Sequence, residues 1–189
     1  MFPFLKVIII CWIIFWIYWF IAAFNTKHSH LGRNLRQFMG IRIVIFVVAV
    51  VLFRFFNVHN SSSIYKLANH KEWVLIIGFI IFLIGLALAI WARINLAKNW
   101  GMPMTQKQNP ELVTSGPYAY IRHPIYSGIL LAILGCVVVI NLFWLIIFAL
   151  AGVYFIYSSV IEEKLLMKQL PNVYPKYKSK TKMLVPFLF

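Results

Sequence analysis

Long apolar stretches constrain the fold of this chain more than any other feature. Apolar side chains dominate residues 5–24, 43–56, 73–92 and 125–160. A helix needs about 20 apolar residues to cross the hydrocarbon layer of a bilayer, and the stretches 5–24 and 73–92 meet that requirement. Only 12% of the residues are charged, about half the share that soluble domains carry. The pattern therefore excludes an ordinary soluble domain and predicts an integral membrane protein.

The number of spans follows from the other two stretches. Residues 125–160 are too many for one span, and Asn141 lies near their middle, so we expect a tight hairpin between spans 125–140 and 142–161. The stretch 43–56 is short, and we expect it to span with Arg54 reaching the interface. The sequence thus predicts an all-α fold, a polytopic transmembrane helical bundle of about five spans. We expect a single domain over residues 1–189, with three spans in 1–92 and the functional part in 93–189.

The basic residues predict an orientation in the membrane. If the expected loops 25–42 and 93–123 and the tail from 162 share one side, that side holds all but four of the 18 Lys and Arg residues. The positive-inside rule then places this side in the cytoplasm and the N-terminus outside, on an uncleaved first helix. The net charge of +14 is spread over membrane-flanking segments. This distribution favours anionic lipid headgroups over nucleic acid as the partner.

Cysteines and small residues carry structural rather than chemical signals. Cys11 and Cys136 fall inside predicted spans without a CxxC partner, so we expect neither a metal site nor a disulfide. Two pairs of small residues are spaced four apart, Gly85 with Ala89 and Gly128 with Ala132. This spacing predicts closely packed helices.

Polar residues gather first in the segment 112–128, which reads LVTSGPYAYIRHPIYSG. Pro124 is suited to the first turn of the fourth span, and Arg122 and His123 directly precede it. The positive end of a helix dipole at this point can receive a carboxylate or phosphate. The alternative is a basic turn that flanks the membrane, with its tyrosines at the interface.

The second polar place is Glu162-Glu163, where the fifth span is expected to leave the membrane. A solvated ion pair with Lys164 or Lys168 is one interpretation. The other is a site for a cationic or hydroxylated ligand. If the fourth and fifth spans form a hairpin, His123 and Glu162 lie at the same level and face each other across a small polar cleft.

The two polar segments are followed by Tyr174-x-x-Tyr177 and by LVPF at 184–187. This combination resembles the isoprenylcysteine carboxyl methyltransferase family and its relatives, the phospholipid N-methyltransferases. The resemblance covers residues 99–187 and implies S-adenosylmethionine as the cofactor, without a metal. The residues that it implies as cofactor contacts are Leu112, Val113, Tyr118, His123, Pro124, Tyr126 and Glu162, with Gly128 allowing close approach. Arg122 and Glu163 are the catalytic candidates. Arg122 could bind the carboxylate of an acceptor, and Glu163 could remove a proton from an acceptor amine. The sequence departs from the eukaryotic carboxyl methyltransferases at Ser158, where those enzymes have an arginine.

The resemblance implies methyl transfer to a membrane-embedded lipid or isoprenylated acceptor, similar to a prenylcysteine carboxylate. Two other enzyme classes remain open: a phospholipid N-methyltransferase and a sterol-type reductase that binds NADPH. A membrane scaffold or a transporter subunit is the non-catalytic alternative. The spans contain almost no ionisable residue beyond Arg54, which argues against a transporter. The oligomeric state is not predicted.

Overall fold

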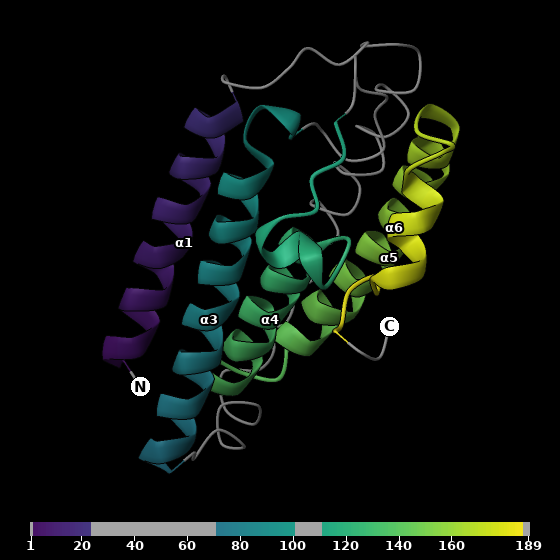
Figure 1. The fold of residues 1–189 in the computed structure, drawn as a ribbon. Helices are drawn as coiled ribbons and strands as arrows, with labels where there is room; N and C mark the ends of the chain where they lie inside the picture. Colours follow the sequence, from purple (N-terminus) through teal and green to yellow (C-terminus); the bar gives the residue numbers. More distant parts are fainter. Residues whose placement is uncertain (1, 24–70, 101–110, 187–189) are drawn as a thin grey trace.

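A computed structural model describes residues 2–23, 71–100 and 111–186 of the chain. The α-helices in these ranges are α1 (Phe2–Ala23), α3 (Glu72–Leu96), α4 (Pro124–Val139), α5 (Trp144–Gln169) and α6 (Tyr174–Lys180). Two short 3-10 helices, η2 (Ala97–Asn99) and η3 (Gly116–Ala119), lie between α3 and α4. Figure 1 shows α1, α3, α4 and α5 side by side as a bundle. The described part of the chain has no strand, which confirms the expected all-α class.

Three of these helices are long and apolar enough to cross a membrane: α1, α3 and α5. They contain most or all of the predicted spans 5–24, 73–92 and 142–161. Helix α4 is apolar but has only 16 residues. The predicted span 43–56 lies outside the described residues. The outward face of α1 carries exposed Ile13, Ile17 and Phe20, as a helix that contacts lipid requires.

The lengths of two helices decide where charged residues lie. Arg93 was expected in a loop, and this expectation is wrong, because Arg93 lies buried in the last turn of α3. Glu162 and Glu163 were expected where the fifth span leaves the membrane, and α5 continues beyond them to Gln169. Both helices extend beyond their most apolar stretches, because an α-helix satisfies its backbone hydrogen bonds internally on either side of a membrane boundary.

Helices α3 and α4 pack closely through small residues, as predicted. A Cβ atom built on Gly85 would lie 2.3 Å from the backbone nitrogen of Ala132, and one built on Gly128 would lie 2.6 Å from that of Ala89. Gly135 faces the backbone of Phe82 at 2.5 Å in the same way. Since lipid supplies little hydrophobic force between helices, such close approach is a main source of their association.

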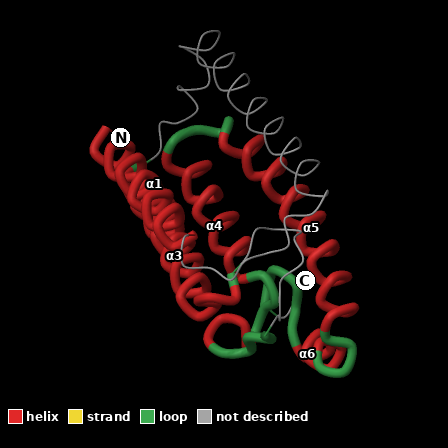
Figure 2. Tube along the Cα trace, turned by 90° about the horizontal axis from the view of Figure 1, so that it is seen from above, coloured by secondary structure: helices red, strands yellow, loops and turns green. Residues whose placement is uncertain are grey.

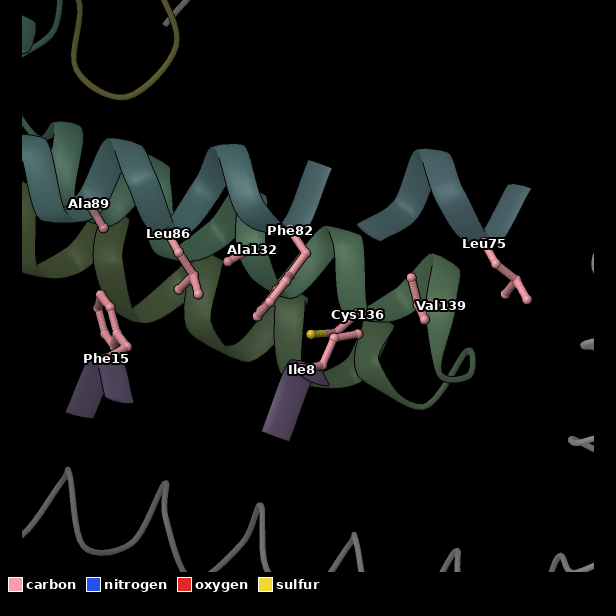
Figure 3. Packing of buried hydrophobic residues seen from close by; sticks show 9 residues of the cluster. All are labelled: Ile8, Phe15, Leu75, Phe82, Leu86, Ala89, Ala132, Cys136 and Val139. Carbon is pink, nitrogen blue, oxygen red and sulfur yellow. The ribbon is translucent and has the colours of Figure 1, made fainter. Parts of the chain in front are cut away.

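Helix α1 covers the α3–α4 pair through an apolar cluster. Figure 3 shows Ile8 and Phe15 of α1 pointing toward the residues of α3 and α4 that form this cluster, including Phe82 and Cys136. Cys11 is half-buried and Cys136 is buried, and both are free.

The turn between α4 and α5 makes these helices antiparallel. Asn141 stabilises it, because its Oδ1 accepts a hydrogen bond from the backbone N–H of Phe143 at 3.1 Å. Figure 2 shows α4 between α3 and α5. The predicted hairpin is therefore present, and it brings the beginning of α4 to the same end of the bundle as the second half of α5.

Candidate active site

The site begins with a turn in the connection between α3 and α4. Gly116 has a φ of +58°, a conformation that other residues adopt only with strain. A Cβ atom at Gly116 would also lie 2.6 Å from the side-chain oxygen of Asn95. The turn starts η3, which buries Tyr118. The Tyr118 carbonyl accepts a hydrogen bond from the Tyr177 hydroxyl at 2.7 Å.

The C-terminal tail, residues 181–184, folds back along the start of α4. The backbone N–H groups of Arg122 and His123 donate to the carbonyls of Lys182 and Met183, at 2.8 and 3.1 Å. The Ser127 hydroxyl donates to the Leu184 carbonyl at 2.5 Å. The tail carbonyls therefore bind the backbone N–H groups just before α4, where one interpretation of the sequence had placed a site for an anionic ligand.

Glu163 belongs to a buried ion cluster that fastens this tail. Its side chain is 3% exposed, with Oε1 2.6 Å from Arg122 Nε and Oε2 2.7 Å from Lys178 Nζ. Arg122 also donates to the carbonyl of Thr181. The interpretation of this glutamate as a solvated partner of Lys164 or Lys168 is wrong, because the return of the tail buries it and supplies other cations.

His123, Tyr126 and Glu162 form the wall of a cavity beside this cluster. The Tyr126 ring stacks between the rings of His123 and Phe155, with centroids 5.5 and 4.5 Å away. Its hydroxyl donates to Glu162 Oε1 at 2.5 Å, and Ser158 Oγ donates to the same oxygen at 2.9 Å. His123 Nδ1 lies 3.7 Å from Glu162 Oε2. The expected proximity of His123 and Glu162 across the hairpin is thus present.

The cavity has a volume of about 460 Å³ and contains both polar and aromatic lining. Seven predicted site residues line it: Leu112, Val113, Tyr118, Arg122, His123, Tyr126 and Glu162. Three others lie outside the lining. Pro124 is buried at the start of α4, Gly128 packs against α3, and Glu163 faces the tail.

The structure adds lining residues that sequence reasoning missed. They include Trp16 and Trp19 of α1, Leu96 of α3, Trp100 after α3, Glu111, Ile129 of α4, and Tyr154, Phe155, Leu165, Leu166 and Gln169 of α5. Those of α5 had a signal in the sequence, because Phe155, Glu162, Leu166 and Gln169 recur at the three- and four-residue spacing of one helix face. The tryptophans of α1 had none, since aromatic residues near the end of a span also serve as interface anchors.

Two tyrosines at the site remain neutral at physiological pH. Burial raises the pKa of Tyr118 above its ordinary value, and nearby Tyr177 and Glu162 raise it further. Burial also raises the pKa of Tyr177 to about 12, although Arg122 lowers it. Within the described ranges, no group of three His, Cys, Asp or Glu side chains is placed to hold a metal ion.

Fold and site together define a polytopic α-helical membrane protein with a polar and aromatic cavity at one end of its bundle. Residues 73–172, more than half of the chain, match the phospholipid methyltransferase family. The chain belongs to this family, and it is therefore a membrane methyltransferase that acts on lipid. A comparison with curated proteins gave no significant match.

Proposed function

We propose that this methyltransferase binds S-adenosylmethionine in the cavity between η3, α4 and α5. The cavity suits such a molecule in size, since about 460 Å³ lies within the ordinary range for small-molecule sites. It also suits the molecule in chemistry, because it combines two carboxylates, an imidazole, an arginine and several aromatic rings. The observation that carries the proposal is the Glu162 carboxylate, held by Tyr126 and Ser158 and turned to the cavity.

Each group of lining residues has a different proposed part in binding. Glu162 suits the ammonium group or the ribose hydroxyls of the cofactor, and Tyr118 with Leu112 and Val113 suits its adenine. When bound, the cofactor supplies an activated methyl group on a sulfonium sulfur. Arg122 and Glu163 bind each other and the tail. We therefore assign these two residues a positioning role, in which they close the site beside His123.

For the acceptor we propose a membrane lipid with an amine headgroup. Besides Glu162, which is assigned to the cofactor, a second carboxylate, Glu111, and several aromatic rings line the cavity, and both kinds of group favour a cation. The eukaryotic carboxyl methyltransferases that the sequence resembles have an arginine at position 158, whereas Ser158 here donates to Glu162. The arginine that does line the cavity, Arg122, is paired with Glu163. An ammonium group must lose a proton before it can accept a methyl group. Of the two candidate bases, His123 and Glu163, only His123 lines the cavity, and we assign this role to it.

We place this end of the bundle in the cytoplasm with the C-terminus, and the N-terminus outside. The lysines of α6 and the tail lie at this end, which agrees with the positive-inside rule. Labelling of a cysteine introduced at exposed Lys180 by an impermeant reagent in intact cells tests the orientation. Protection before lysis and labelling after it are expected.

Ligand-induced thermal stabilisation of the detergent-solubilised protein tests the cofactor. S-adenosylhomocysteine is expected to raise the melting temperature, whereas NADPH is not. Glu162→Gln should remove the effect of S-adenosylhomocysteine, while Glu72→Gln, at an exposed position on α3, should keep it. Stabilisation by NADPH alone would assign the cavity to a reductase and refute the proposal.

Transfer of a labelled methyl group tests the acceptor. The protein is supplied with vesicles that contain phosphatidylethanolamine and, separately, with a prenylcysteine analogue. Label in the phospholipid headgroup is expected. Label only in the prenylcysteine would show that a carboxylate is the acceptor and would refute the assignment of an amine.

A further inference from the structure

Arg93 is a buried cation whose partners lie at the ends of two helices. It lies in the last turn of α3 and is only 4% exposed. Its Nη2 donates to the carbonyl of Ala22 in α1 at 2.6 Å, and its Nη1 donates to the carbonyl of Ala97 at 2.9 Å. Both carbonyls belong to helix C-terminal ends, which carry a partial negative charge. These two ends supply part of the compensation that a buried guanidinium requires, while its Nε is buried without a hydrogen-bond partner among the described residues.

The same guanidinium lies against an aromatic wall of the cavity. Its carbon atom is 4.7 Å from the centre of the Trp100 ring. Trp100 and Trp19 form a T-shaped pair, with their ring centroids 6.1 Å apart. Trp19 and Trp100 line the cavity together with Trp16, whereas Arg93 does not. Arg93 therefore contacts Trp100 without lining the cavity itself, and its hydrogen bond to Ala22 connects α1 to this aromatic wall.

This aromatic wall, formed by Trp16, Trp19 and Trp100, differs in chemistry from the Glu162 side. Leu96 and Ile129 extend the apolar lining, whereas His123 and Glu162 belong to the polar part. Trp16 lines the cavity and is still 56% exposed on the flank of α1. Since α1 is apolar enough to span the membrane, we expect that flank to contact lipid. An apolar group that enters the cavity from the bilayer thus meets the aromatic wall first.

We propose that Arg93 is a positioning residue that holds α1 so that its tryptophans form the binding surface for the apolar part of the lipid acceptor. The assignment of the acceptor rests on the proposed function. Arginine suits this position, because its planar fork reaches two carbonyls while its face lies on a tryptophan ring. A lysine ammonium retains the charge but cannot do both. Helix α1 precedes the segment that matches the family, so Trp16 and Trp19 lie outside the matched region, whereas Trp100 and Arg93 lie within it.

Arg93→Lys is the central variant of the test, since it keeps the buried charge and changes only its geometry. Trp19→Leu and Trp100→Leu alter the wall directly. Trp91→Leu is the matched control, because Trp91 lies on the same helix as Arg93 and is 50% exposed. For each variant, KM and kcat are measured with vesicles that contain phosphatidylethanolamine. The dissociation constant of S-adenosylhomocysteine and the amide hydrogen exchange of residues 16–22 are measured beside them.

Arg93→Lys is expected to raise the KM for the lipid and the exchange rate in residues 16–22 by about tenfold each, which corresponds to the loss of one charged hydrogen bond. The affinity for S-adenosylhomocysteine should stay within about twofold, since that ligand is assigned to the polar part of the cavity. The two tryptophan variants should raise the KM in the same way, and Trp91→Leu should not.

An unchanged exchange rate in residues 16–22 would overturn the positioning role of Arg93. A KM that rises only in parallel with the loss of S-adenosylhomocysteine binding would overturn the assignment of the wall to the acceptor. If the wild-type protein methylates no lipid, the proposed function fails. The exchange data alone then decide whether Arg93 holds α1.

Discussion

Glu163→Gln tests the ion cluster that fastens the C-terminal tail. The substitution keeps the size of the side chain and removes its charge. Arg122, whose side chain is only 9% exposed, then loses its carboxylate partner. We expect the variant to be destabilised and the tail to separate more easily from the start of α4.

The magnitude follows from burial. Removing one partner of a buried ion pair costs about 3–5 kcal/mol, because the other charge remains buried. The glutamine oxygen can still accept from Arg122, so the lower end of this range, about 3 kcal/mol, applies to Glu163→Gln. Lys178 is 44% exposed, and its contact with Glu163 contributes less, about 1 kcal/mol at most. For a chain of this length, about 3 kcal/mol lowers the melting temperature by about 10 °C.

Thermal unfolding in one detergent, followed by circular dichroism, measures the effect. Glu72→Gln serves as the control, because it removes the same charge at an exposed position. Lys178→Gln should lower the melting temperature by no more than about 3 °C. If Glu163→Gln lowers it no further than Lys178→Gln does, the cluster does not stabilise the fold and the reasoning from burial is refuted.

Three further predictions follow from single contacts. Ser158→Ala removes a donor to Glu162 and should weaken S-adenosylhomocysteine binding about fivefold in calorimetry; unchanged affinity would remove this serine from the site. Gly128→Ala adds a methyl group 2.6 Å from a backbone nitrogen of α3 and should lower the melting temperature, whereas Gly152→Ala, with nothing within 4 Å, should not; equal effects would contradict close helix packing. Folding raises the pKa of Tyr177 from 10.0 to about 12, so this hydroxyl ionises more easily in the unfolded chain. Its contribution to the free energy of unfolding is therefore fully present below pH 10 and is lost as the pH rises from 10 to 12. Tyr177→Phe should therefore show a shallower fall in melting temperature above pH 10, and an identical fall would refute the assignment.

The sequence by itself determined the membrane environment, the class of the fold and the order of the spans. These properties depend on the length and composition of local segments, because a bilayer selects uncharged stretches of about 20 residues as helices. The hairpin at Asn141 and the small-residue contact between α3 and α4 were also readable, since both depend on spacing within one or two helices. Seven of the ten predicted site residues line the cavity. They could be predicted because they lie close together in two short segments of the sequence.

Only the tertiary structure decided the surroundings of the charged residues. The sequence left Glu163 open to two interpretations, a solvated ion pair or a ligand site, and the return of residues 181–184 buries it with Arg122 and Lys178. Arg93 was expected in a loop, but the end of α1, 71 residues earlier in the chain, supplies one of its partners. A charged side chain is compensated by whichever groups the fold brings to it, and those groups are distant in sequence. The apolar composition of a segment determines whether it enters the membrane. The position of α1 beside the cavity depends instead on contacts between distant residues, which no local pattern encodes.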